Sequence, residues 1–176
     1  DGAAELDRAV ELAPELVIAR YFRARHALQA GQLDQALNDL NIAAQLDAQN
    51  PLIAVEIGRA HLLRDDLAQA EAWLVRARDL RPDEALGWKA LAELYAGRGY
   101  GPREQAVSVA QAAVQRAPFD AEAHVWLAAA YLAAGERGAA EGELQRAQSL
   151  NPTLALTQLY LGRLYGRGTE AGQLAY

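Results

Sequence analysis

Cysteine and methionine are both absent from the 176-residue chain. Without cysteine there is no disulfide, no thiolate metal site and no cysteine nucleophile, and any redox compartment is tolerated. The cytoplasm and the periplasm are therefore both allowed as locations. Because even position 1 is not methionine, we expect the chain to be a processed or excised fragment of a larger protein.

Basic residues are scarce relative to acidic ones. Lys89 is the only lysine, Lys and Arg together number 17 against 23 Asp and Glu, and the formal net charge is −6. Binding to a nucleic-acid backbone needs a basic face that displaces counterions, so we expect no nucleic-acid ligand. No apolar run approaches the length of a membrane-spanning helix, so we expect no membrane insertion of this chain either. A hydrophobic fraction of 52% is nevertheless ample for a folded core.

A repeat of about 34 residues organises the chain. One series of alanines is spaced by 34, 34, 36 and 34 residues, and a second series repeats by 34, 36 and 34. The first series is Ala9, Ala43, Ala77, Ala113 and Ala147, and the second is Ala36, Ala70, Ala106 and Ala140. Prolines at 14, 82, 118 and 152 keep the same register, where each predicts the end of a helix. Two independent small-residue series with one period indicate a repeat architecture.

Each period predicts a helix, a tight turn and a second helix. Apolar residues recur at helical spacing, and glycines or an acidic pair stand near the middle of the period. Small residues recur on the first helix at Ala24, Gly58, Ala92, Ala128 and Gly162. They face the second alanine series, where only a small side chain lets two helix axes approach closely. The predicted fold class is therefore all-α.

One repeat carries a pattern that resembles the tetratricopeptide repeat (TPR) family. The residues that trace this pattern are Trp88, Leu91, Ala92, Tyr95, Ala106, Ala113 and Pro118. The resemblance implies a single α-solenoid over residues 1–176, a right-handed superhelix of stacked antiparallel helix pairs. Full repeats are expected at 17–50, 51–84, 85–120 and 121–154. Residues 1–16 are expected to be the second helix of a preceding repeat, and 155–176 a partial repeat or capping helix.

The repeat at 85–120 departs most from the family pattern. Ala110 and Arg116 replace leucines, and two extra residues lie in the glycine-rich turn at 97–102. We expect this unit to be the least protected complete repeat and a hinge. Elsewhere Arg23 stands where a large aliphatic residue is usual.

No catalytic constellation is visible. His26, His61 and His124 lie in separate repeats. An Asp lies four positions from His61 and another four positions from His124, but each His and Asp pair provides only two metal ligands. The GRGYG sequence at 97–101 follows a helix and lacks the lysine and hydroxyl of a phosphate loop. We therefore predict no enzyme activity, no metal and no cofactor.

The resemblance implies a concave groove lined by the first helix of each pair. The residues it places there are Ile18, Tyr21, Arg25, Leu52, Val55, Arg59, Leu86, Lys89, Glu93, Glu122, Val125, Leu159 and Arg163. Aliphatic columns with interspersed arginines predict a protein or peptide partner that is apolar with acidic residues. The lysine and asparagine clamp of chaperone-binding TPR domains is not matched.

These observations predict a non-catalytic protein-interaction scaffold, and the composition resembles bacterial TPR proteins of envelope assembly, secretion or export systems. The alternative is a passive spacer or oligomerisation segment of a larger enzyme or regulator. The first helix carries apolar Leu6, Val10 and Leu12 without a preceding partner, so we also expect end-to-end self-association.

Overall fold

A computed structural model describes residues 2–166 and contains only helices and turns over that range. The helices are α1 (Gly2–Leu12), α2 (Val17–Gln29), α3 (Leu33–Leu46), α4 (Pro51–Leu63), α5 (Leu67–Leu80), α6 (Ala85–Ala92), the π-helix η1 (Glu93–Gly97), α7 (Arg103–Arg116), α8 (Ala121–Ala134), α9 (Arg137–Leu150) and α10 (Ala155–Tyr165). The all-α fold expected from the sequence is confirmed. The expected partial repeat at 155–176 extends beyond the described residues.

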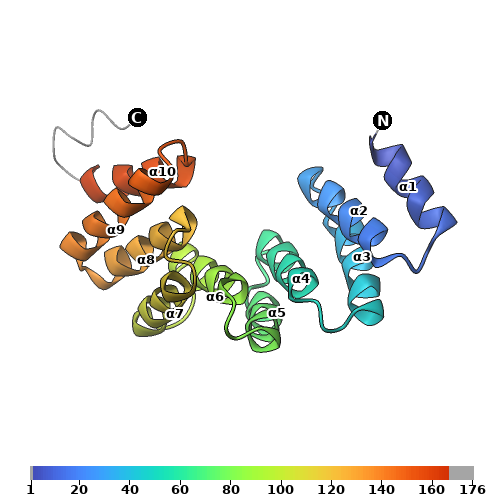
Figure 1. Ribbon diagram of the computed structural model, residues 1–176, viewed down its shortest axis with the longest axis horizontal. Helices are drawn as coiled ribbons and strands as arrows, with labels where there is room; N and C mark the ends of the chain where they lie inside the picture. Colours follow the sequence, from blue (N-terminus) through green and yellow to red (C-terminus); the bar gives the residue numbers. More distant parts are fainter. Residues whose placement is uncertain (1, 167–176) are drawn as a thin grey trace. The chain divides into compact units, whose positions relative to one another are not determined.

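The chain divides into two compact units (Figure 1). The N-terminal unit runs through Pro82 and holds α1 to α5; the C-terminal unit begins at Asp83 and holds α6 to α10. Within the first unit α2 packs on α3 and α4 on α5, and α2 also contacts α4. Within the second unit α8 packs on α7, α9 and α10. The repeat boundaries and the single solenoid expected from the sequence remain predictions.

The turns explain where the helices begin and end. Asn50 caps α4 by accepting the amide hydrogen of Leu52, and Asp120 caps α8 by accepting those of Glu122 and Ala123. Inside a helix pair the chain turns through a left-handed residue, which is Gly135 (φ 85°) between α8 and α9. Asp65 takes the same conformation at φ 60° between α4 and α5. Aspartate tolerates this region better than most non-glycine residues, so the acidic pair substitutes for glycine here.

Close helix contacts occur where the sequence has small residues. A Cβ atom on Gly58 would lie 2.5 Å from Leu74 Cδ2 and 2.7 Å from its Cγ, so α4 and α5 meet through a glycine. Leu74 itself is fully buried. The core of the N-terminal unit is built from Ala24, Ala27, Ala36, Leu37, Leu40, Ala43, Ile53, Ile57 and Ala60. The core of the C-terminal unit includes Val125, Ala128, Ala140, Leu144, Ala147, Tyr160 and Leu164.

The two extra residues of the third repeat come with a feature that the sequence did not predict. The first helix of this repeat changes into the π-helix η1 over its last five residues, Glu93–Gly97. The turn that follows uses left-handed Gly99 and Gly101, and the rings of Tyr95 and Tyr100 stack with centroids 6.4 Å apart. A π-turn accommodates extra residues within a helix, so the insertion is shared between helix and turn.

Candidate functional site

An apolar socket lies on the surface of α2 and α4 in the N-terminal unit. It has a volume of about 270 Å³ and is lined by Val17, Ile18, Tyr21, Asp47, Asn50, Leu52 and Ile53. Ile18 is 51% exposed and Leu52 is 48% exposed. These two aliphatic residues are 34 positions apart, so the helical repeat places equivalent side chains on both helices. Asn50 and Asp47 form the polar side of the lining, where the side-chain amide of Asn50 donates a hydrogen bond to the Asp47 carboxylate at 2.9 Å.

Charged groups surround Tyr21 beside this socket. The Cζ atom of Arg25 lies 5.8 Å from the centroid of the Tyr21 ring, a cation–π arrangement. Arg59 Nη1 on α4 lies 3.6 Å from Glu56 Oε1. Burial is the main cause that raises the pKa of Tyr21; the Glu56 carboxylate adds to it, and Arg25 and Arg59 oppose it. Tyr21 is therefore influenced by two guanidinium groups and the Glu56 carboxylate, in addition to the Asp47 carboxylate in the socket lining.

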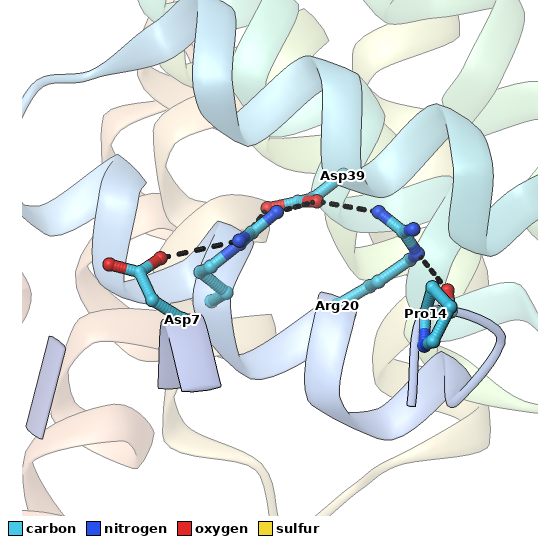
Figure 2. A network of polar contacts seen from close by, with 5 residues as sticks. Asp7, Pro14, Arg20 and Asp39 are labelled. Atoms are coloured by element: carbon cyan, nitrogen blue, oxygen red, sulfur yellow. Dashed lines mark hydrogen bonds and ion pairs between the residues drawn. The ribbon is translucent and has the colours of Figure 1, made fainter. Parts of the chain in front are cut away.

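A buried ion-pair network holds the opposite side of α2 (Figure 2). The carboxylate of Asp39, on α3, is fully buried and accepts hydrogen bonds from Arg23 at 2.7 Å and from Arg20 at 3.0 Å. Arg23 Nη1 also donates to Asp7 on α1 at 3.2 Å, and Arg20 Nε donates to the Pro14 carbonyl at 2.6 Å. The hydrogen bond to Asp39 raises the pKa of Arg23. These contacts fix α2 against α1 and α3, and hence the direction in which Ile18 and Tyr21 point.

The single lysine of the chain is engaged in the C-terminal unit. Lys89 Nζ lies 2.7 Å from Asp120 Oδ2 and 3.0 Å from Glu122 Oε2. Burial alone would lower the pKa of Lys89, but its hydrogen bonds to the two carboxylates outweigh burial and leave it raised. Burial alone would raise the pKa of Asp120, but the interaction with Lys89 outweighs burial and leaves the pKa of Asp120 lowered. Lys89 and Glu122, both expected in the groove, thus bind each other.

A larger, more polar cavity of about 500 Å³ lies between η1, α8 and α10. Its lining includes Ala96, Ala129, Ala133, Arg137, Tyr160 and Arg163. The Cζ atom of Arg163 lies 4.7 Å from the Tyr160 ring centroid. Burial is again the main cause that raises the pKa of Tyr160; the nearby Arg163 lowers it, and the Glu93 carboxylate raises it. This cavity has no cluster of exposed aliphatic residues in its lining.

The residues expected in the groove differ in exposure. Val55 is 1% exposed and Val125 is 0% exposed, so both contribute to packing and offer no surface to a partner. Leu159 is 51% exposed, Arg25 and Arg163 are exposed, and Tyr21, Arg59, Leu86, Lys89, Glu93 and Glu122 are half-buried. The structure brings together Ile18, Tyr21, Leu52, Arg25 and Arg59 around the socket. Glu56 also belongs to this group, although it was not among the residues expected in the groove.

The histidines have structural partners that differ from those suggested by sequence spacing. His61 Nδ1 lies 3.5 Å from Asp66, and His124 contacts Glu143 at 2.6 Å and the Pro118 carbonyl at 3.0 Å. Within residues 2–166, no group of three or more histidine, aspartate or glutamate side chains could hold a metal ion. None of the helices described there is long and apolar enough to cross a bilayer.

Repeated pairs of helices that meet through small residues, as α4 and α5 do at Gly58, define a helical-repeat protein of the solenoid class. Residues 27–94 match the sequence profile of the tetratricopeptide repeat family. The cellulose synthase operon protein C of Pseudomonas fluorescens (strain SBW25) is 32% identical over 114 residues, which cover 63% of this chain and 9% of that protein. The chain thus spans less than a tenth of the length of this curated relative.

Solved structures show the same fold. The TPR protein TTC0263 of Thermus thermophilus is 25% identical, with a TM-score of 0.75 over 85% of this chain and 81% of that chain. YrrB, described as a TPR protein with an unusual peptide-binding site, is 20% identical, with a TM-score of 0.65 over 88% of this chain and 79% of that one. MamA of Desulfovibrio magneticus RS-1 is 21% identical, with a TM-score of 0.69 over 90% and 88%.

Residues 27–94 thus match the tetratricopeptide repeat family, and the described helices have the fold of solved tetratricopeptide repeat proteins. The resemblance stated from the sequence is confirmed, and the fold is that of a protein–protein interaction scaffold.

Proposed function

We propose that this chain is a non-catalytic scaffold that binds a peptide segment of a partner protein on the α2 and α4 surface. The observation that carries the proposal is the socket in which Ile18 and Leu52 remain about half exposed beside Arg25. Apolar side chains in a concave pocket lose contact with water when a partner covers them, which is worth about 25 cal/mol per Å² before the costs of association. The nearby guanidinium groups favour a partner that also carries carboxylates.

Peptide selection against the intact chain tests this proposal. Peptides selected from a random display library would be labelled, and their affinities measured by fluorescence anisotropy for the wild type and for Leu52→Asp. We expect Leu52→Asp to weaken binding by at least about tenfold, because it places a charge in an apolar socket. Leu63→Asp is the matched control, since Leu63 lies on the same helix, is 57% exposed and does not line the socket.

Equal binding by the wild type and Leu52→Asp would place the ligand elsewhere. A selection that enriches no peptide at all would favour the alternative of a passive spacer or oligomerisation segment.

We further propose that the chain serves a bacterial envelope assembly or export system. The support is the 32% identity to a protein named for the cellulose synthase operon. Deletion of the gene in its host, followed by measurement of surface polysaccharide, tests this context. We expect reduced export that the intact gene restores, and unchanged polysaccharide would contradict the assignment.

A further inference from the structure

The charged and apolar parts of the α2 and α4 surface are arranged in the same order on both helices. Each helix carries an aliphatic residue at the socket in its first turn, Ile18 or Leu52, and an arginine seven positions later, Arg25 or Arg59. The aliphatic end also holds Asp47, which hydrogen-bonds to Asn50. A carboxylate on a ligand is therefore repelled at the socket end and attracted toward the arginine end.

Both guanidinium groups lie closer to the socket than their positions in the sequence indicate. Side chains on a helix tilt toward its N-terminus, and the Cζ atom of Arg25 accordingly lies 5.8 Å from the centroid of the Tyr21 ring. Arg59 Nη1 likewise reaches back to Glu56, at 3.6 Å. The positive charge is thus centred about one helical turn from the socket, or roughly 5.4 Å along the helix axis.

We propose that this surface selects an extended peptide in which an aliphatic residue and an acidic residue are separated by one residue. The aliphatic side chain fills the socket and the carboxylate binds Arg25. In an extended chain, residues i and i+2 point to the same side and lie roughly 6.6 Å apart. This spacing is comparable to the 5.8 Å between the Cζ atom of Arg25 and the centroid of the Tyr21 ring, which lines the socket. This inference rests on the proposed function and specifies the partner that the same site accepts.

The distribution of apolar surface favours an extended ligand over an amphipathic helix. A helical ligand presents a stripe of apolar residues over successive turns and needs several apolar contacts in a row. Here the turn beyond the socket carries the Glu56 carboxylate, whose side chain is only 14% exposed. A second apolar anchor would cover that carboxylate and remove its remaining water. Phe22, 46% exposed, does not line the socket.

Arginine is suited to this role because its planar guanidinium presents several N–H donors in a fixed fork. Arg25 is exposed, and the carboxylate of the ligand would join a group of Arg25, Arg59 and Glu56 whose formal charges sum to one positive. Binding one carboxylate neutralises that excess. A second acidic residue in the same ligand would therefore add much less binding free energy.

The test uses a random octapeptide display library and the intact chain. We expect enriched peptides to share an aliphatic residue and an aspartate or glutamate separated by one residue. For a representative peptide, exchange of the acid for its amide should weaken binding to the wild type by about tenfold, as for a charge-assisted hydrogen bond that is partly shielded from water. With Arg25→Gln, the acid and amide peptides should bind within about twofold of each other.

Arg64→Gln is the matched control, because Arg64 lies at the end of α4, is 47% exposed in its side chain and pairs with Asp34. This variant should keep the full preference for the acid. Enrichment of acids four residues from the aliphatic residue, as on a helix, would overturn the inference, and so would a preference for acids that Arg25→Gln leaves intact. The proposed function fails separately, when binding is insensitive to Leu52→Asp. If binding depends on Leu52 but the enriched peptides lack the acidic residue at this spacing, the inference fails and the proposed function stands.

Discussion

Asp39 and Arg23 form a two-pronged ion pair between α3 and α2. Arg23 Nε donates to Asp39 Oδ2 at 2.7 Å and Arg23 Nη2 donates to Asp39 Oδ1 at 2.7 Å, while the Asp39 side chain is fully buried. Arg23 replaces the large aliphatic residue that is usual at its position in the family. The network in Figure 2 therefore takes the place of an apolar contact in this repeat.

We expect Asp39→Ala to destabilise the N-terminal unit strongly. The substitution leaves two guanidinium groups, Arg20 and Arg23, facing a buried space without their shared acceptor, and breaking such a pair costs about 3 to 5 kcal/mol. Chemical denaturation followed by circular dichroism measures the loss. Asp34→Ala is the control, because the Asp34 side chain is 92% exposed in its pair with Arg64 and its removal should cost less than about 1 kcal/mol. Similar losses for both variants would contradict a special role for the network.

Glycines at equivalent repeat positions should respond in opposite directions to alanine. We expect Gly58→Ala to destabilise the protein by about 1 to 3 kcal/mol, because the new Cβ would lie 2.5 Å from Leu74 Cδ2 and 2.7 Å from Cγ. Gly162→Ala meets nothing within 4 Å and should stabilise α10 by roughly 0.5 to 1 kcal/mol through reduced backbone entropy. Thermal unfolding of both variants checks the opposite signs. A gain in stability for Gly58→Ala would show that Leu74 moves aside easily.

The period of the repeat made the fold predictable, because each helix pair forms from nearby residues and contacts mainly its neighbours. Small residues such as Gly58 could be identified because helix contacts exclude larger side chains. The Asp39 network was not identified, since its members lie on three helices and Arg23 differs from the family pattern without revealing its partner. Two basic residues on one face of α2, three positions apart, were the available signal.

The candidate site was only partly predictable for a related reason. Ile18, Leu52 and Arg25 are accessible, but Val55 and Val125, assigned to the groove by family resemblance, are buried. Exposure of such a position depends on the rotation and packing of its helix, which a repeat pattern does not specify. The π-helix η1 also depends on tertiary packing, since a Cβ on Gly97 would lie 2.8 Å from the Trp126 ring.

The Lys89 and Asp120 pair should make stability depend on acid pH. The pKa of Asp120 is lowered in the folded state, so its contribution is present above its ordinary value of 3.8 and is lost as the pH falls through the lower folded value. Asp120→Asn keeps a capping oxygen but removes the charge. We expect it to be less stable than the wild type on the order of 1 kcal/mol at pH 7, with the difference shrinking toward zero as the pH falls below the ordinary value of 3.8. Thermal midpoints of both proteins at several pH values measure this, and a constant difference down to pH about 2 would argue against the ion pair.

The second helix of the repeat at 85–120 buries smaller side chains than the second helix of the following repeat. Helix α7 buries Ala106, Val109, Ala110 and Ala113, whereas α9 buries the larger Leu144 with Ala140 and Ala147. The leucine missing from α7 at position 110 leaves less apolar area in the layer, and the turn before α7 contains two left-handed glycines.

We therefore expect amide hydrogens of residues 106–116 to exchange faster than those of residues 140–150. Local opening requires the loss of fewer apolar contacts in α7, and exchange rates report the free energy of that opening. Hydrogen exchange measured by mass spectrometry on the intact chain gives both rates in one experiment. Ala110→Leu provides a second measurement: if the missing side chain is the cause and the core accommodates it, protection of α7 should rise toward that of α9. Equal protection of the two helices in the wild type would contradict this expectation. Two contacts of this repeat would then account for the compensation: the stacked rings of Tyr95 and Tyr100, and the Cζ atom of Arg116, which lies 4.5 Å from the centroid of the Trp88 ring.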